Sequence, residues 1–455
     1  MSNRISPKPQ TFRIDNRWLF AAVLTPVILS TGISPKTFAA GLYRDGVDAR
    51  SMSLGGITVA DAYNPLSALY GNPGALSELQ KTELTLSGTG ALLHGEFSNH
   101  ANRDSTLNTQ GVLGSAALAV PVGPFRFALG FNPDMALKAG WRYHDTPGGA
   151  DGATTYGLRG HDSEISLLRT QFGASWQIIP QLSVGAGIGL LYNQNRLNAP
   201  YVFQQQPVLR TVKTLLDLNT EGYGYNFQVG VEFKPVKPVH IGVSYTSGSR
   251  IESSGHASGN ANVQLRNLGL GAARSDFDYD AKVTNNFPQQ VAAGVAVDVT
   301  SKLRVLVEED WINWADSFDR LEVKLRNGSN ADLNGLVGSS GMNDYVPLRW
   351  RDQYVTRLGA EYAVNDNWTV RAGYSYANNP VPDNTVTPLT AAIMEHTVSA
   401  GVGYRKDWFG VDLAYQWMLP ATVHTGTSIL ASGEYSNSNL TVSAQTLNLT
   451  VNLQF

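Results

Sequence analysis

The chain ends with Thr446-Leu447-Asn448-Leu449-Thr450-Val451-Asn452-Leu453-Gln454-Phe455, in which polar and apolar residues alternate without interruption. Successive side chains of a β-strand point to opposite faces, so this segment has one polar and one apolar face. About ten residues are also what a tilted strand needs to cross a bilayer. A strand of this kind that stops on an aromatic residue is typical of bacterial outer-membrane β-barrels. We therefore expect Phe455 to be recognised by the barrel assembly machinery.

The composition is consistent with a barrel in a membrane. Charged residues make up 16% of the chain, against about 25% in soluble domains. Glycine accounts for 45 of the 455 residues, which indicates many positions of close backbone packing. The absence of cysteine excludes disulfides and thiolate chemistry. A net charge of −3 provides no basic surface for nucleic acid.

The N-terminus is typical of an export signal. A basic segment precedes a largely apolar stretch from Trp18 to Ile33, and small residues end at Ala39 and Ala40. The pattern predicts a signal peptide over residues 1–39, cleaved after Ala39. The alternative is a membrane-anchoring helix, but the apolar stretch is shorter than the roughly 18 residues that such a helix requires.

Period-2 segments recur from residue 82 to the end. They predict 14 strands, near residues 82–95, 110–122, 125–140, 163–179, 182–198, 220–235, 238–254, 286–299, 302–318, 352–364, 367–379, 394–407, 409–420 and 442–455. A soluble β-sandwich also alternates, but its strands are usually shorter and its outward face is polar. Here the apolar face continues over too many segments to fit one soluble core.

Connection lengths decide between these two architectures. After even-numbered strands the links are tight: Gly123-Pro124, Pro180-Gln181, Val236-Lys237, Ser301, Asn365-Asp366 and Asp407. After odd-numbered strands the links are long. Short periplasmic turns that alternate with long external loops are the pattern of outer-membrane barrels. The sequence therefore predicts an all-β fold, a 14-stranded antiparallel transmembrane β-barrel over residues 82–455, in a bacterial outer membrane and without a partner subunit.

Two places break the pattern. The third strand meets Phe131-Asn132-Pro133-Asp134, where proline removes a ladder donor and belongs at an end or a bulge. Either the wall is locally broken there, or the strand ends at Phe131 and a loop begins. In the ninth strand Glu309 falls on the expected lipid face, so we expect either a shift in register or a position at the rim of the membrane.

Residues 40–81 do not alternate and are turn-rich. About 40 residues are too few for a stable core of their own. Large barrels often carry a plug in the lumen, and we expect this segment to be one.

Several short motifs occur in the mature chain in a fixed order. They are Gly41-Leu42-Tyr43, Ser53-Leu54-Gly55-Gly56, Val59-Ala60-Asp61, Ala68-Leu69-Tyr70, Asn72-Pro73, Trp350-Arg351-Asp352, Arg357-Leu358-Gly359-Ala360-Glu361-Tyr362, Trp368-Thr369-Val370-Arg371-Ala372-Gly373-Tyr374, Pro380-Val381-Pro382-Asp383 and Gly401-Val402-Gly403-Tyr404. This ordered set resembles the FadL family of outer-membrane long-chain fatty acid transporters, which includes importers of aromatic hydrocarbons.

The resemblance implies a 14-stranded barrel with an N-terminal hatch that contains Asn72, Pro73 and Gly74. It also implies lateral release of an apolar ligand through a kinked third strand, which places a lateral gate at Phe131, Asn132, Pro133 and Asp134. The family's hatch motif is usually Asn-Pro-Ala. Gly74 stands at the alanine position, which suggests a looser turn, because glycine has more backbone freedom.

Ligand contacts are expected in two further places. Residues 206–218 predict an amphipathic helix after the fifth strand, with Val208, Leu209, Val212, Leu215 and Leu216 on its apolar face. This helix either caps the barrel mouth or forms one wall of an external capture groove. Arg210 and Lys213 on its polar face are expected to contact water or lipopolysaccharide phosphates.

Inward-facing charges could position a ligand carboxylate, and Arg357, Glu361 and Arg371 are the candidates. The more usual role of such residues is in lumen salt bridges that hold a plug. We expect no metal site, no cofactor and no catalytic residue, because no nucleophile motif or metal-ligand spacing is present.

Taken together, the sequence predicts passive uptake of hydrophobic molecules, foremost long-chain fatty acids, with the outer-membrane lipid and lipopolysaccharide as surroundings. Import of aromatic hydrocarbons is the alternative within transport. A general porin and an outer-membrane lipid-modifying enzyme are the alternatives from other classes.

Overall fold

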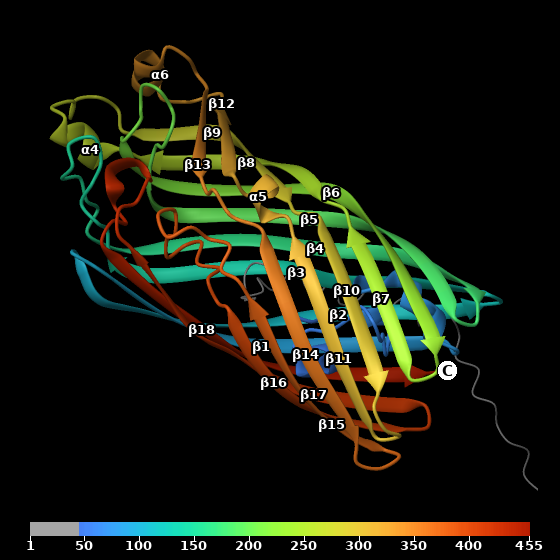
Figure 1. Ribbon diagram of the computed structural model, residues 1–455. Helices are drawn as coiled ribbons and strands as arrows, with labels where there is room; N and C mark the ends of the chain where they lie inside the picture. The colour runs from blue at the N-terminus through green and yellow to red at the C-terminus, as the bar shows by residue number, and fades with distance from the viewer. Residues whose placement is uncertain (1–44) are drawn as a thin grey trace, which may run out of the picture.

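The computed structural model describes residues 45–455, which form one closed antiparallel β-barrel (Figure 1). Its sheet contains eighteen strand segments, but four barrel strands are each divided in two, so the barrel has 14 strands, as predicted. Pairing of β1 (Glu83–Asn99) with β18 (Ser438–Gln454), from Glu83 opposite Gln454 to Ser98 opposite Asn439, closes the wall. The predicted signal peptide, residues 1–39, lies outside the described residues.

The undivided strands that remain are β2 (Asn102–Val122), β3 (Phe125–His144), β4 (Leu158–Ile179), β5 (Leu182–Val202), β6 (Lys213–Val236), β15 (Trp368–Ala377), β16 (His396–Lys406) and β17 (Phe409–Thr425). The divided strands are β7 (Val239–Thr246) with β8 (Ser249–Asn260), β9 (Asp276–Phe287) with β10 (Gln290–Asp298), β11 (Leu303–Ile312) with β12 (Arg320–Arg326), and β13 (Met342–Pro347) with β14 (Gln353–Ala363).

The short turns all lie at one end of the barrel, which we call the turn end, and the long connections lie at the loop end (Figure 1). Short helices occur in or near the long connections: α4 (Asn262–Asn267), α5 (Trp314–Ser317), α6 (Ala331–Val337) and η2 (Ala431–Gly433). The strands extend further toward the loop end than the sequence predicts, since β2 begins at Asn102 and β4 at Leu158. No helix within residues 45–455 is long and apolar enough to cross a membrane.

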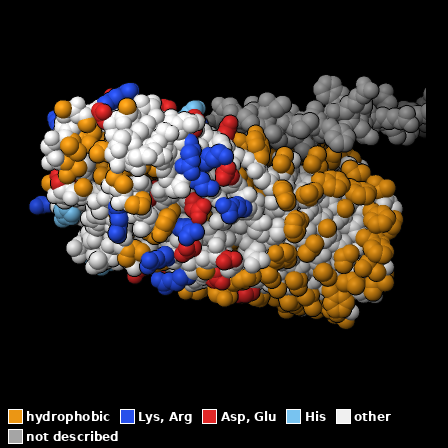
Figure 2. Space-filling model, turned by 90° about the horizontal axis from the view of Figure 1, so that it is seen from above, with side chains coloured by type: hydrophobic (Ala, Val, Ile, Leu, Met, Phe, Trp, Pro, Cys, Tyr) orange, Lys and Arg blue, Asp and Glu red, His pale blue; other side chains and the backbone are white. Residues whose placement is uncertain are grey.

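Apolar side chains cover the outside of the barrel toward the turn end, and a belt of charged side chains borders them (Figure 2). In β6, alternate residues from Tyr223 to Phe233 point outward and are 39–68% exposed. A surface of this kind is stable only against lipid. Glu309 also points outward, with no shift of register, and its carboxylate accepts a hydrogen bond of 2.6 Å from Thr356 Oγ1 on β14.

Residues 45–81 lie inside the barrel and contain α2 (Ala49–Ser53), α3 (Pro65–Tyr70) and η1 (Pro73–Glu78). These helices are only five or six residues long. The side chains of Asp48, Asn64 and Asn72 cap these helices by accepting hydrogen bonds from backbone N–H groups in the first turn. Isolated helices of this length are unstable in water, so contacts with the wall hold this segment, which we call the hatch.

Wall glycines let the hatch backbone approach the strands. A Cβ added at Gly185 on β5 would overlap Pro73, one at Gly242 on β7 would overlap Val59, and one at Gly373 on β15 would overlap Gly55. All three glycines face inward on separate strands. The high glycine content of the chain is therefore explained in part by a plug whose backbone touches the wall.

Gly373→Ala is expected to displace the hatch, because its methyl group meets backbone atoms that cannot rotate away. Overpacking of this kind costs about 1–3 kcal/mol, and it should lower the unfolding temperature and expose residues 45–81 to protease. Gly88→Ala is the matched control, since nothing lies within 4 Å of a Cβ there. If the two variants have the same unfolding temperature and the same rate of proteolysis, the hatch backbone does not pack against Gly373.

Candidate functional site

An ion-pair network binds the hatch to the barrel. Arg50 of α2 contacts Glu361 of β14 at 2.9 Å and Asp61 at 2.7 Å. Arg371 of β15 contacts the same Glu361 at 2.5 Å and Asp412 of β17 at 2.7 Å. Both arginines are less than 6% exposed. Glu361 thus joins one hatch arginine to one wall arginine.

Arg357 of β14 forms a second such centre. Its guanidinium contacts Asp45 at 3.0 Å and Asp310 at 2.8 Å. Nearby, Glu308 of β11 accepts hydrogen bonds from the backbone N–H groups of Thr58 and Val59, at 2.9 and 2.7 Å. The three predicted lumen charges, Arg357, Glu361 and Arg371, therefore all lie in contacts that fasten the hatch, and Arg357 also lines the cavity described below.

Asn72, Pro73 and Gly74 lie where the hatch meets β5 and β6. The side-chain amide of Asn72 donates to the carbonyls of Val59 and Val231, both at 2.9 Å. A Cβ at Gly74 would stand 2.8 Å from the carbonyl oxygen of Gly230. Glycine at this position therefore permits a close approach to the wall, and the looser turn suggested by the sequence is not its main consequence.

The wall is incomplete between β2 and β3. Their ladder runs only from Val122 opposite Phe125 to Ala116 opposite Phe131. Beyond it, β2 pairs only with β1, and β3 pairs only with β4, with a register shift between Pro133 and Met135. The alternative in which the third strand ends at Phe131 is wrong, because β3 continues to His144. A proline without an N–H group is tolerated here because β2 has already diverged.

Polar side chains occupy the side of this break that faces the turn end. Ser115 of β2 donates to the side-chain carbonyl of Asn132 at 2.8 Å, and Asn132 donates to Asp134 at 2.9 Å. Asp134 in turn contacts Arg169 of β4 at 2.7 Å. At the side that faces the loop end, Asn102 and the backbone of His144 exchange two hydrogen bonds of 2.8 Å. The sequence-predicted gate residues therefore lie at the point where the two strands separate.

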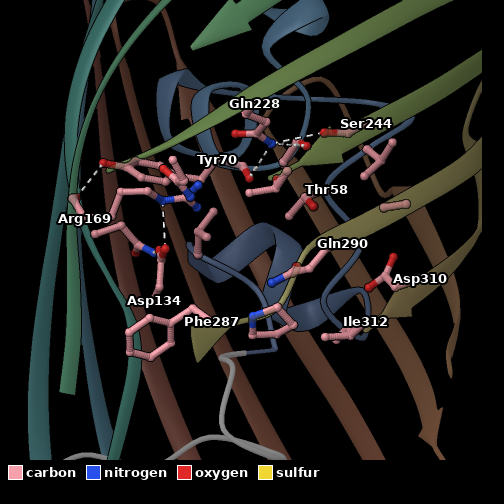
Figure 3. A pocket seen from close by; sticks show the side chains of 18 of the residues that line it. Thr58, Tyr70, Asp134, Arg169, Gln228, Ser244, Phe287, Gln290, Asp310 and Ile312 are labelled. Carbon is pink, nitrogen blue, oxygen red and sulfur yellow. Dashed lines mark hydrogen bonds and ion pairs between the residues drawn. The ribbon is translucent and has the colours of Figure 1, made fainter. Parts of the chain in front are cut away.

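A cavity of about 130 Å³ lies between this break and the hatch (Figure 3). Asn132, Asp134 and Arg169 line one side, and Thr58 and Tyr70 of the hatch line another. The guanidinium of Arg169 lies 4.8 Å from the centre of the Tyr70 ring. Its Nη1 is buried and has no hydrogen-bond partner among residues 45–455. Of the two arginines that line the cavity, Arg169 and Arg357, Arg169 thus keeps a buried N–H group that can donate to an anionic ligand.

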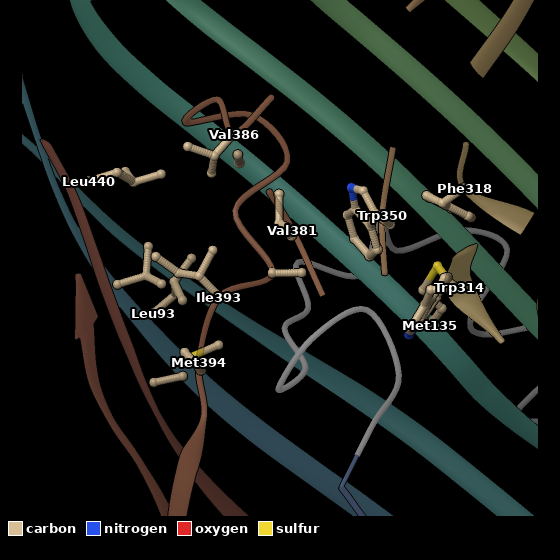
Figure 4. Close-up of a cluster of buried hydrophobic side chains, with 14 of the residues drawn as sticks. Leu93, Met135, Trp314, Phe318, Trp350, Val381, Val386, Ile393, Met394 and Leu440 are labelled. Carbon is tan, nitrogen blue, oxygen red and sulfur yellow. The ribbon is translucent and has the colours of Figure 1, made fainter. Parts of the chain in front are cut away.

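On the loop-end side of the hatch, a cluster of apolar side chains lines the lumen (Figure 4). Met135 and Trp314 of this cluster are fully buried, and Val386 and Ile393 come from the connection between β15 and β16. That connection, residues 378–395, folds into the barrel. It accepts a hydrogen bond of 2.8 Å from Trp141 Nε1 at the carbonyl of Pro388. No sequence pattern predicts that this external loop lines the interior, because its apolar residues have no period.

A second cavity, of about 170 Å³, lies among the external connections. Its lining is almost wholly apolar and includes Phe203, Val208, Leu209, Val212, Ala261, Leu265, Leu268, Leu270, Phe277, Tyr279, Leu333, Leu336 and Met342. We call it the external groove. Three of the five predicted groove residues, Val208, Leu209 and Val212, line it; Leu215 and Leu216 do not. The groove also needs the connections that contain α4 and α6, which lie far away in sequence.

The predicted helix over residues 206–218 is wrong. Residues 207–211 form a turn, and β6 begins at Lys213, where it pairs with Val202 of β5. The ladder with β5 supplies a hydrogen-bonded partner that a sequence pattern does not reveal. A short isolated helix, by contrast, must bear the cost of nucleation alone.

Lys213 is not at a solvated face. It is fully buried and contacts Asp145 at 2.7 Å and Glu434 at 2.6 Å, so it joins the β3–β4 and β17–β18 connections. Its ammonium also donates to the carbonyl of Thr146 at 2.6 Å. Burial raises the pKa of Glu434 to about 7 and also raises the pKa of Asp145, although Lys213 opposes both shifts. We call these three residues the cap cluster.

Comparison with known proteins agrees with this architecture. The chain is 21% identical over 296 residues to a long-chain fatty acid transport protein of Escherichia coli O6:H1, covering 60% of this chain and 61% of that relative. The Escherichia coli K12 protein of the same name is 25% identical over 209 residues, or 44% and 43% of the two chains. The chain therefore spans less than two thirds of these relatives in alignment.

Solved structures show the same fold at low identity. The Pseudomonas putida toluene transporter TodX superposes with a TM-score of 0.73 at 19% identity, covering 91% of this chain and 99% of that one. A Pseudomonas aeruginosa FadL homologue gives 0.71 at 16% identity, covering 91% and 100%. A family sequence model matches residues 31–455. The chain belongs to the outer membrane protein transport protein family (OMPP1/FadL/TodX) and is an outer-membrane β-barrel.

Proposed function

We propose that this protein carries hydrophobic molecules inward across the outer membrane without an energy source, and that long-chain fatty acids are its main ligands. The observation that carries the proposal is an apolar lumen that the hatch closes toward the turn end while the wall is unpaired between β2 and β3. A solute that enters this lumen can leave sideways into lipid without crossing water.

The route begins in the external groove, continues through the apolar lumen around Trp141 and Ile393, and reaches the cavity beside Asn132 and Arg169. Each methylene exposed to water costs about 0.8 kcal/mol, so an apolar path lowers the barrier for a long acyl chain. The gate residues then lie at the exit into the outer leaflet.

Arg169 supplies a test of the ligand class. A fatty acid carboxylate can pair with its buried guanidinium, whereas toluene has no charge to place there. Arg169→Leu with Asp134→Asn, which removes the guanidinium without leaving the buried Asp134 carboxylate unpaired, is expected to reduce uptake of labelled oleate strongly while leaving uptake of labelled toluene within about twofold, since a lost charged hydrogen bond costs about 1.5–3 kcal/mol. Arg196→Leu, an exposed arginine of β5, is the control.

The opposite result supports the aromatic alternative. If toluene uptake is efficient and oleate neither enters nor competes with it, aromatic hydrocarbons are the ligands. The apolar cluster of the lumen suits this second candidate as well, and the toluene transporter TodX shares the fold. A general porin would instead give large single-channel conductance in a planar bilayer, and a lipid-modifying enzyme would turn over an ester.

The external groove is expected to capture the ligand first. Val208 and Leu336 lie at its rim and are 54% and 48% exposed. Replacing both by Ser removes about 1–2 kcal/mol of apolar contact, so uptake at limiting ligand should fall about tenfold. Leu158→Ser, at an exposed leucine outside the groove, should have little effect. Equal uptake by both variants would remove the groove from the route.

We further propose that the barrel works as a monomer and reaches the membrane through recognition of Phe455 by the assembly machinery. The side chain of Phe455 is 45% exposed at the turn end, while its backbone N–H donates a hydrogen bond of 2.9 Å to the carbonyl of Thr82. The terminal aromatic ring is thus available to a partner.

A further inference from the structure

The belt of charged side chains that borders the apolar surface contains one unusual arrangement (Figure 2). Lys282 of β9 and Lys324 of β12 stand directly opposite each other in the ladder, and both point outward. Their side chains are 50% and 35% exposed. No other lysine or arginine stands opposite another in the strand pairs of residues 45–455. Like charges directly opposite each other destabilise a sheet.

The two lysines share a single carboxylate. Glu252 of β8 contacts Lys282 at 2.7 Å and Lys324 at 3.7 Å. Four residues from the lysine row toward the turn end, Arg250 and Arg320 also point outward on the same sheet face. Arg320 contacts Glu322 at 3.1 Å and lies 5.4 Å from the centre of the Tyr345 ring. Glu252 and Glu322 thus lie between the lysine row and the two arginines, and Asp280 lies two residues beyond Lys282 toward the loop end, opposite Arg326.

The height of this cluster relative to the membrane follows from the ladder. Ser254 of β8 pairs with both Lys282 and Glu221 of β6, so the lysines and Glu221 lie in one row. Two and four residues further toward the turn end on β6 come Tyr223 and Tyr225, each 68% exposed. Exposed tyrosines mark the membrane interface. The lysine row therefore lies at the level of the lipid headgroups, on the side of the external loops.

We propose that Arg250, Lys282, Arg320 and Lys324 form a binding site for the phosphate groups of lipopolysaccharide in the outer leaflet. A phosphate between the opposed lysines relieves their repulsion, and the two arginines lie four residues along the strands nearer to the acyl chains. The site is independent of ligand transport, because it lies outside the barrel and requires only the outer-membrane location.

The test measures binding of phosphorylated lipid A to the full barrel in detergent by native mass spectrometry. A basic residue near an anionic headgroup contributes about 1 kcal/mol, or about fivefold in affinity. Lys282→Gln with Lys324→Gln should therefore weaken binding about 25-fold. Arg103→Gln with Arg142→Gln removes two exposed charges from β2 and β3 and should change it less than twofold.

Two further measurements distinguish a phosphate-specific lipid site from nonspecific lipid or phosphate binding. Glu252→Gln should strengthen binding, because both lysines lose their competing carboxylate, and this variant decides the question if the double lysine variant does not fold. Dephosphorylated lipid A should bind no better than a neutral detergent. Equal binding of dephosphorylated lipid, unchanged binding by the lysine variant, or complete displacement by millimolar inorganic phosphate would each overturn the proposal.

Discussion

Replacing Asn132 by Val and Pro133 by Ala is expected to reduce uptake of labelled oleate to that of cells without the protein. The change removes the Asn132 side chain that accepts from Ser115 and donates to Asp134, and it restores a backbone N–H group at position 133. A β-branched residue also favours the strand conformation. Upper β3 can then pair with β2, and each ladder hydrogen bond formed contributes about 0.5–1.5 kcal/mol.

The matched control is Pro200→Ala, which changes a proline in the β5–β6 ladder away from the break. Both variants should reach the membrane in equal amount and show the same heat-modifiable migration. Uptake at the level of the unmodified protein, in a folded barrel with the double substitution, would show that the break between β2 and β3 is not the exit.

Lys213→Met is expected to open the external cap. Its ammonium is the cation of the cap cluster, and its loss leaves the buried carboxylates of Asp145 and Glu434 without compensation. Breaking a buried ion pair in this way costs about 3–5 kcal/mol. Hydrogen exchange of residues 145–157 and 426–437 should therefore rise strongly near neutral pH, and lowering the pH to about 5 should partly restore protection by protonating a carboxyl.

The unmodified cap should show the same sign of pH dependence. Glu434 has a pKa of about 7 when the cap is closed and about 4.3 when it is exposed. The closed cap therefore binds more protons, so its stability is fully present below the exposed value and declines as the pH rises to about 7. Lys234→Met, which removes the partly exposed ion pair with Glu78 at the turn end, should not alter this exchange. A cap that becomes more protected as the pH rises would contradict the assignment.

The sequence predicted the part of the barrel that contacts lipid, because there the alternation of Tyr223, Tyr225 and Phe227 with polar residues is imposed by the bilayer. It did not predict β9, β12 and β13 at the loop end. Those strands do alternate, but their outward face is polar, with Lys282 and Lys324, and their apolar residues, such as Phe277 and Tyr279, point into the barrel, so no apolar lipid face marks them. Near Leu216 the helix and strand patterns coincide, and only the distant pairing with β5 decides between them.

The candidate site was predicted only where a local irregularity marks it. Asn132 and Pro133 are visible in the sequence because proline is out of place in a strand. Arg169 and Trp141 carry no such mark, since inward-facing residues of every strand share their pattern. The partner of Lys213, Glu434, lies more than 200 residues away along the chain, and no spacing rule connects them. Contacts between loops depend on closure of the barrel.

The most direct test of lateral transfer is photo-crosslinking with a long-chain fatty acid that carries a diazirine near its methyl end, in native outer-membrane vesicles. We expect labelled peptides from the two edges of the break, residues 103–115 of β2 and 132–143 of β3, in addition to the groove. Labelling confined to the turn-end face of the hatch, with none on either edge, would show that the ligand passes through the barrel and not through its wall.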